Sequence, residues 1–137
     1  MSERIRIVNL TRGTLLGGQV ALADSWWGRF RGFMGREEPR RGEGMLLVPC
    51  DGVHMYGLKF DLDLVFLGTS GQVLAVMERL GPWRRSGRIH GSRYALELPA
   101  GTIEATGTAI GDTLAWSAEE SFLRTPRGAH EYSISDY

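Results

Sequence analysis

A cysteine, a histidine and two aspartates lie within one short stretch of the sequence, at Cys50, His54, Asp61 and Asp63. Residues four apart in an extended chain face the same side of a sheet, so Cys50 and His54 can lie together. A thiol beside an imidazole can act as a nucleophile with its base, or the two can hold a metal ion, and Asp63 could orient the imidazole. Pro49 and Gly52 also predict a bend here, and a lone cysteine after an apolar run is more often a small core residue.

Two carboxylates interrupt strands that are otherwise apolar. Asp63 lies within the run 62–67, and Glu97 lies within the run 94–98. Burying an unpaired carboxylate costs free energy, so each side chain should face solvent, cap a backbone group or form an ion pair. The partner in such an ion pair would be Arg29, Arg31 or Lys59. Either acid could instead lie in a polar cleft, where two carboxylates can bind a cation.

These side chains define a candidate ligand-binding set. We expect a cleft lined by His54, Met55 and Asp63, with contributions from Arg31, Cys50 and Glu97. The leading hypothesis is a non-enzymatic binding or accessory module for a small molecule or a protein, with no cofactor and no metal. The first alternative is a thiol- or metal-dependent enzyme that uses Cys50, His54 and Asp63.

A loop rich in glycine and arginine, residues 81–92, contains the tryptophan most expected to be exposed, Trp83. Its basic neighbours are Arg84, Arg85 and Arg88. An exposed tryptophan beside arginine is typical of the residues that dominate protein interfaces. The second alternative is therefore a protein-interaction domain that docks through this loop, although the loop could also be a lid over a pocket.

Short apolar runs separated by glycine predict a mainly β domain. The expected strands cover residues 4–8, 15–23, 45–48, 53–56, 62–67, 73–77, 94–98 and 114–116. Helical spacing of aromatic residues predicts one packed helix near residues 25–34, in which Gly28 and Gly32 should allow close packing. A short second helix is expected near residues 102–106, capped by Thr102 and ended by Gly107. The expected fold is a single-domain antiparallel β-sandwich or barrel-like domain over residues 1–116, with a polar extension over 117–137.

Composition excludes several classes of protein. The 137 residues fit one domain, and the 16 basic and 16 acidic side chains give no net charge, which argues against nucleic acid as the main partner. One cysteine permits no disulfide within the chain. The N-terminal residues do not resemble a signal peptide, and no uncharged stretch reaches the roughly 18 residues of a membrane span, so we expect a cytoplasmic protein without a membrane partner. Composition leaves the oligomeric state open.

Several strings occur together in a recognisable order: RFRGFM at 29–34, GML at 44–46, HM at 54–55, DLDLVF at 61–66, VLAV at 73–76, LELPAG at 96–101 and GD at 111–112. Their order and spacing over about residues 5–116 resemble the DUF192 family, also called UPF0127, whose role is uncharacterised. The resemblance implies a compact β-sandwich or barrel-like domain with one packed helix and a short second one. Many relatives carry a Trp-Met-Lys-Asn-Thr segment where this chain has residues 53–57, so Met55 matches and His54 replaces the tryptophan.

Overall fold

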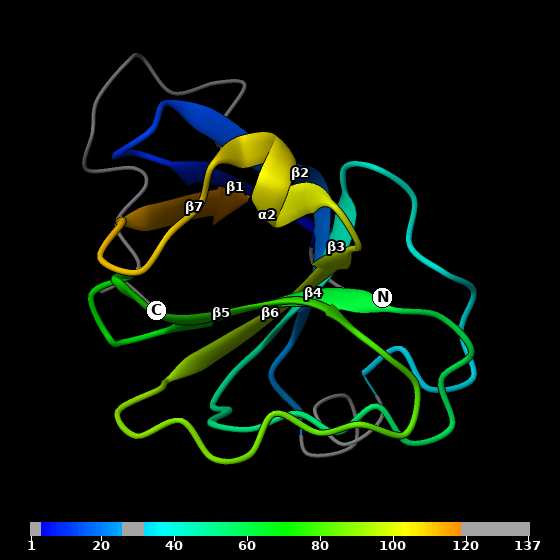
Figure 1. Cartoon of the computed structure of the whole chain (residues 1–137). Helices are drawn as coiled ribbons and strands as arrows, with labels where there is room; N and C mark the ends of the chain where they lie inside the picture. Colours follow the sequence, from blue (N-terminus) through cyan, green and yellow to red (C-terminus); the bar gives the residue numbers. More distant parts are fainter. Residues whose placement is uncertain (1–3, 26–31, 119–137) are drawn as a thin grey trace.

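A single seven-stranded sheet organises the chain and curls strongly into half of a barrel (Figure 1). The computed structural model describes residues 4–25 and 32–118. The strand order is β5-β4-β6-β3-β2-β1-β7. The strands are β1 (Arg4–Asn9), β2 (Thr14–Ala23), β3 (Glu43–Leu47), β4 (Leu62–Leu67), β5 (Val73–Leu80), β6 (Tyr94–Pro99) and β7 (Leu114–Ala118), and a short helix, α2, covers Thr102–Thr106. The predicted mainly β, barrel-like single domain is thereby confirmed.

One strand pair corrects the prediction of a purely antiparallel fold. β2 and β3 run parallel, with Gln19 opposite Glu43 and Ala23 opposite Leu47, while the other paired strands are antiparallel. Parallel neighbours need a crossover connection of a dozen or more residues, which the chain between β2 and β3 supplies. Sequence signals for hairpins involve only neighbouring residues, so they do not reveal a long crossover connection between two parallel strands.

The remaining predicted elements differ in outcome. Residues 53–56 form no strand, since only His54 makes an isolated bridge, to Arg85. Most of the predicted helix at 25–34 lies outside the described residues, and residues 32–35 form turns. Close packing at Gly32 is confirmed, because a β-carbon there would come within 3.0 Å of an oxygen of Glu97. Gly28 lies outside the described residues.

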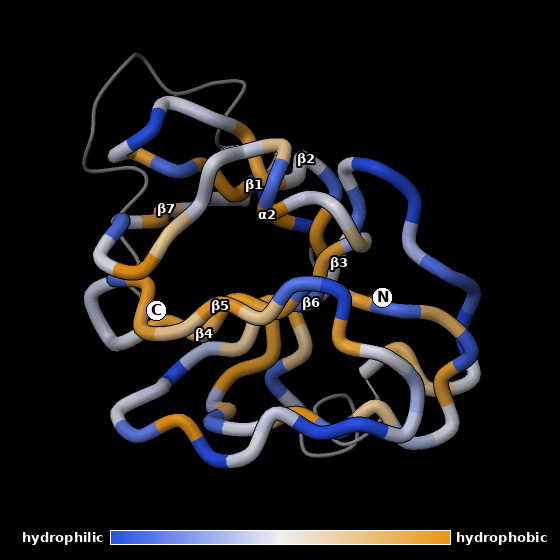
Figure 2. Tube along the Cα trace, viewed as in Figure 1, coloured by the Kyte–Doolittle hydropathy of each residue, from blue (hydrophilic) through white to orange (hydrophobic). Residues whose placement is uncertain are grey.

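The sheet separates two apolar clusters, and alternate residues of β4 contribute to both. Val65 and Leu67 of β4 belong to the first cluster, whereas Leu64 and Phe66 belong to the second. Every residue of β4 is buried, and apolar residues follow the central strands in Figure 2. Residues from the segment after β3 close the second cluster: Val53, Met55 and Leu58. The core therefore positions the backbone around His54.

Asp63 is completely buried in β4 and ties three segments together. Its Oδ1 accepts a hydrogen bond of 2.8 Å from the backbone N–H of Arg79, in β5. Its Oδ2 accepts hydrogen bonds from the N–H groups of Gly101, at 3.1 Å, and Ile103, at 2.9 Å. A register shift between β4 and β5 lies beside this contact, and Arg79 has a φ of 53°, which turns its N–H away from the regular ladder. Asp63 thus follows one predicted alternative, the capping of backbone groups.

The beginning of α2 differs from the prediction, because Asp63 accepts hydrogen bonds from the backbone N–H groups of Gly101 and Ile103 there. Gly101 is the N-cap, and it has no side chain to cap the helix. The hydroxyl of Thr102 donates to the carbonyl of Pro99, 2.7 Å away, so the expected Thr102 cap is wrong. Asp63 supplies the acceptor instead, from another strand. Gly107 ends the helix as predicted, with a φ of 72°.

Glu97 is a buried acid in a different environment. It lies on β6 opposite Met45 and Leu64 and is 3% exposed. None of the described residues donates a hydrogen bond to its Oε1. Burial raises the pKa of Glu97 to about 8, because the apolar surroundings disfavour the charged carboxylate. Glu97 is therefore not exposed to solvent, and none of the described residues forms an ion pair with it. Arg29 and Arg31, two of the cations predicted as partners, lie outside the described residues.

Replacing Asp63 by asparagine should lower the free energy of unfolding by about 2–3 kcal/mol, because the amide NH2 would face buried N–H donors that need an acceptor. Urea unfolding measures this change. Asp61→Asn, at an exposed position two residues earlier, is the matched control and should leave stability unchanged within about 0.5 kcal/mol. Equal stabilities of the two variants would show that Asp63 does not anchor these turns.

The free energy of unfolding should fall as the pH rises from about 4.5 to about 8. The folded state keeps Glu97 protonated up to about pH 8, whereas the unfolded chain loses this proton near 4.5. Glu97→Gln should remove this decline and be the more stable protein at pH 8, as measured by urea unfolding across the pH range. Glu104→Gln, at an exposed position on α2, should keep the decline. A wild-type profile in the Glu97 variant would refute the assignment.

Candidate functional site

The structure joins two segments that the sequence treats as separate candidate sites. The segment around His54 pairs with the loop that carries Trp83, through an antiparallel bridge between His54 and Arg85. The N–H of Met55 donates to the carbonyl of Arg84 at 2.7 Å, and the N–H of Trp83 donates to the carbonyl of Met55 at 2.9 Å. These bonds place the His54 candidate and the Trp83 candidate on one surface.

Three aromatic side chains form a stack on this surface, which we call the aromatic ladder (His54, Tyr56 and Trp83). The ring centroids of His54 and Tyr56 are 4.8 Å apart with planes at 29°, and those of Tyr56 and Trp83 are 5.9 Å apart with planes at 26°. Trp83 is nevertheless 69% exposed, which confirms its predicted exposure, and Tyr56 is 40% exposed. The ladder therefore presents ordered aromatic surface to solvent.

The backbone holds Trp83 in a conformation that tryptophan rarely adopts. Its φ is 66°, in the left-handed region, which costs a non-glycine residue about 1 kcal/mol or more. The N–H of Trp83 is fixed on Met55, and the N–H of Arg84 donates to the carbonyl of Gly81 at 3.2 Å. Met55 itself is completely buried in the second cluster. The core thus maintains a strained turn that keeps the indole at the surface.

Positive charge lies beside the aromatic ladder. Arg84 and Arg85 are exposed and form no ion pair with any residue in the described ranges. Arg88 differs, because its Nε contacts Asp51 at 2.8 Å. Of the three arginines predicted for an interaction surface, two thus remain available to an anionic group.

The other predicted site residues lie elsewhere or have structural partners. Cys50 is half-buried, packs against the second cluster and contacts the carbonyl of Gly52 through its thiol, at 3.2 Å. The partners of Asp63 lie at residues 79, 101 and 103, and Glu97 is enclosed in the core. Arg31 lies outside the described residues. Of the candidate ligand-binding set, His54 thus contributes its side chain to the aromatic ladder, while Met55 contributes backbone.

Within residues 4–25 and 32–118, no three cysteine, histidine, aspartate or glutamate side chains gather in an arrangement that could hold a metal ion. Within the same ranges, no helix has the length and apolar character needed to cross a membrane.

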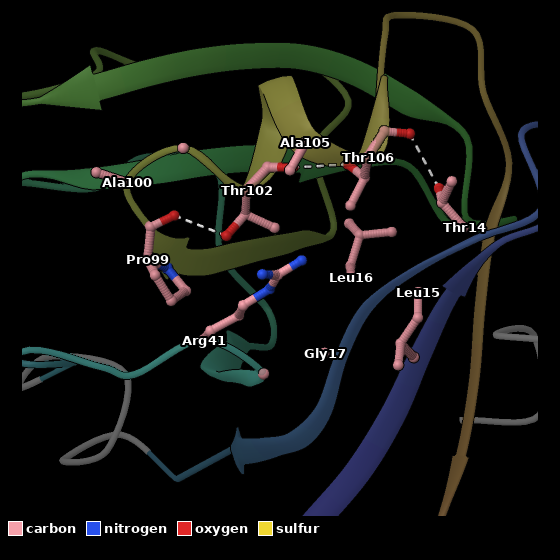
Figure 3. A pocket seen from close by; sticks show the side chains of 12 residues that line it. Thr14, Leu15, Leu16, Gly17, Arg41, Pro99, Ala100, Thr102, Ala105 and Thr106 are labelled. Carbon is pink, nitrogen blue, oxygen red and sulfur yellow. Dashed lines mark hydrogen bonds between the residues drawn. The ribbon is translucent and has the colours of Figure 1, made fainter.

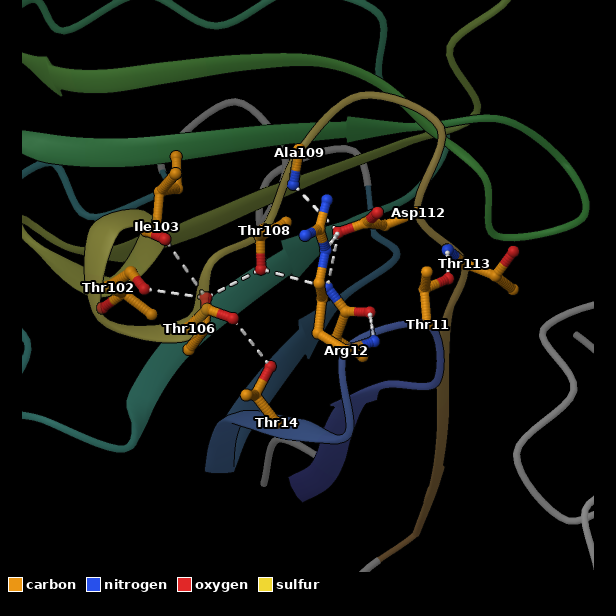
Figure 4. Close-up of polar contacts among 11 residues, drawn as sticks. Thr11, Arg12, Thr14, Thr102, Ile103, Thr106, Thr108, Ala109, Asp112 and Thr113 are labelled. Atoms are coloured by element: carbon orange, nitrogen blue, oxygen red, sulfur yellow. Dashed lines mark hydrogen bonds and ion pairs between the residues drawn. The ribbon is translucent and has the colours of Figure 1, made fainter.

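Sequence reasoning missed a buried polar network at the other end of the sheet (Figure 4). Asp112, predicted only as a turn residue, is 3% exposed. Its Oδ2 accepts hydrogen bonds of 3.0 Å from Asn9, from Arg12 and from the N–H of Ala109. The bonds from Arg12 and Asn9 lower the pKa of Asp112 to about 2. No local signal reveals this network, because Asn9 and Arg12 lie about a hundred positions from Asp112 along the chain. The network fastens the β1–β2 turn to the segment before β7.

Sequence comparison places this fold among known relatives. The DUF192 family, described as Uncharacterized ACR, COG1430, matches residues 7–116. A UPF0127 protein of Thermococcus sibiricus is 31% identical over 126 residues, which cover 88% of this chain and 80% of that protein. A UPF0127 protein of Pyrococcus furiosus is 29% identical over 116 residues, covering 81% and 97% of the two chains.

Two solved structures share the fold. A Sinorhizobium meliloti protein, described as "a putative transcription regulator", has a TM-score of 0.69 and 28% identity, covering 83% of this chain and 92% of that one. A Novosphingobium aromaticivorans protein of unknown function has a TM-score of 0.69 and 21% identity, covering 82% and 84%. The family match spans most of the residues and the described fold agrees with both structures, so this chain belongs to the DUF192 (UPF0127) family.

Proposed function

We propose that this chain is a non-enzymatic binding module that recognises an acidic segment of a partner protein through the aromatic ladder, Arg84 and Arg85. The observation that carries this proposal is the exposure of Trp83, which stays 69% exposed although its ring is stacked and its backbone is strained. A stacked, backbone-fixed tryptophan loses little conformational freedom when a partner covers it. Much of the contact energy would then remain available for affinity.

Charge favours an acidic partner. Two arginines beside the aromatic ladder can each donate a bidentate pair of hydrogen bonds to a carboxylate. Trp and Arg are also the residue types that most often dominate the energy of protein interfaces. The proposed surface includes His54 and Trp83, so it combines the binding hypothesis with the interaction hypothesis.

A protein partner fits this surface better than nucleic acid. The chain has no net charge, and Asp51 neutralises Arg88 at the edge of the surface. Tight binding to a duplex commonly involves six or more phosphate contacts, which two arginines do not supply. The regulatory description of the Sinorhizobium meliloti relative applies to that protein, and DNA therefore enters the test as the competing ligand. We also propose a cytoplasmic location, which the single cysteine favours over an oxidising compartment.

Trp83→Ala should weaken binding of glutamate-rich peptides that carry an aromatic residue by at least about tenfold, because it removes the largest exposed contact surface. Fluorescence anisotropy with labelled peptides measures the affinity, and lysine-rich peptides of equal length test the role of charge. The double variant Arg84→Glu/Arg85→Glu should also lose binding. Ile110→Ala, an exposed apolar position (67%) outside this surface, and Arg36→Glu are the matched controls and should bind as the wild type does.

Equal affinity of wild type and Trp83→Ala for the acidic peptides would overturn the proposed surface. Tighter binding of duplex DNA than of any acidic peptide, abolished by the Arg84→Glu/Arg85→Glu variant, would also overturn the proposal. That outcome would instead favour a role on nucleic acid.

A further inference from the structure

A cleft of about 690 Å³ lies between α2 and β2 (Figure 3). In Figure 1, α2 lies on the side of the sheet away from the loops that carry the aromatic ladder. This volume falls within the range of about 300–1,000 Å³ that is common for small-molecule sites. The turn at residues 99–102 and the turn at residues 41–42 form its walls. The aromatic ladder contributes no residue to it, so a ligand here would be independent of the proposed protein partner.

Backbone contacts fix the walls of the cleft. The N–H of Gln19 donates to the carbonyl of Gly42 at 2.9 Å, which joins β2 to the 41–42 turn. A β-carbon at Gly17 would come within 2.9 Å of that same carbonyl, so only glycine permits this approach. Asp63 holds the N–H of Gly101 and thereby fixes the opposite wall. The cleft is therefore largely formed before any ligand enters.

Arg41 is the one charged residue among the described residues that line the cleft. It lies in a turn in which the N–H of Glu43 donates to the carbonyl of Arg40 at 2.9 Å, and Gly42 has a φ of 92°. The carboxylate of Glu43 accepts the N–H of Arg40 at 2.7 Å. Arg41 makes no ion pair with any described residue, and Figure 3 shows its guanidinium reaching toward Pro99 and Thr102.

The threonine hydroxyls that line the cleft around Arg41 have no hydrogen left to donate to a ligand, because each already donates to a backbone carbonyl. The hydroxyl of Thr14 donates to the carbonyl of Thr106 at 3.0 Å, and that of Thr106 donates to the carbonyl of Thr102 at 2.8 Å. The hydroxyl of Thr102 is likewise used on Pro99. Each hydroxyl hydrogen is thus committed within the protein, and the guanidinium is the side-chain donor that remains for a ligand. The rest of the lining includes the apolar side chains of Leu15, Leu16 and Ala105.

We propose that this cleft binds a small monocarboxylic acid with an apolar body, whose carboxylate pairs with Arg41 and whose hydrocarbon part lies on Leu15 and Ala105. One guanidinium matches one carboxylate in bidentate geometry. A multiply charged anion fits less well, because Arg41 is the one cation among the described lining residues and the Asp63 carboxylate binds the N–H of Gly101 in the 99–102 turn. Leu15 is 44% exposed, so a ligand would remove apolar surface from water.

Titration of the ¹⁵N-labelled protein with octanoate, followed by NMR, tests the site. We expect saturable shifts at the amides of Leu15, Gly17 and Ala105, with a millimolar or tighter dissociation constant. Octanamide has the same chain without the charge and should bind at least about tenfold more weakly, because it cannot form the ion pair. Phenylacetate should shift the same amides, since the proposal concerns the carboxylate and an apolar body rather than one chain shape.

Two variants separate the charge from the shape of the cleft. Arg41→Gln should weaken the binding of octanoate at least about tenfold. Arg40→Gln removes the same charge from a neighbouring residue outside the lining, so it should leave the affinity for octanoate unchanged. Ala105→Trp should block the cleft, whereas Glu104→Trp, on the same helix but outside the lining, should leave binding intact. Wild-type amide spectra away from the cleft would show that each variant is folded.

Three results would overturn the proposal: no saturable shifts with either carboxylate at millimolar concentration, equal affinity for octanoate and octanamide, or unchanged affinity in folded Arg41→Gln. None of these results would affect the peptide assay at the aromatic ladder, because the two sites share no residue.

Discussion

The buried carboxylate of Asp63 is the constraint on which both candidate binding surfaces depend. It accepts the N–H groups of Arg79, Gly101 and Ile103, three donors that would otherwise be left unpaired close to the core. Each buried donor without an acceptor costs about 1–3 kcal/mol, so these segments cannot rearrange independently. The contact at Arg79 fixes the end of β5, from which the loop with Trp83 departs. The contacts at Gly101 and Ile103 fix the turn that forms one wall of the Arg41 cleft.

The aromatic ladder depends on the core in a second way. The segment that carries it has no regular strand of its own, and Met55 anchors it by lying completely within the second cluster. The same residue accepts the N–H of Trp83 through its carbonyl, so the strained turn is attached directly to a buried anchor. The stabilisation of the core thereby offsets the cost of a left-handed tryptophan at the surface.

Sequence patterns predicted the features that depend on neighbours along the chain. Alternation and glycine breaks located most strands and the end of α2 at Gly107, and the polar surroundings of Trp83 predicted its exposure. The features that were missed depend on contacts between distant segments. The parallel pairing of β2 with β3 is one, and the network of Asp112 with Asn9 is another. The sequence near a strand does not indicate whether a distant strand will pair with it in parallel, and it does not identify a hydrogen-bond partner a hundred residues away.

Asp63 and Glu97 show how little a local pattern says about a buried acid. Both interrupt apolar strands, and the two strands pair directly, with Asp63 opposite Leu98 and Leu64 opposite Glu97. Asp63 meets three backbone donors, whereas Oε1 of Glu97 meets the apolar second cluster and Gly32, with no donor among the described residues. Both residues are buried acids, yet Asp63 stabilises turns whereas burial raises the pKa of Glu97. Since the difference arises from what packs against each side chain, the role of a buried acid follows from tertiary structure rather than from its place in a strand.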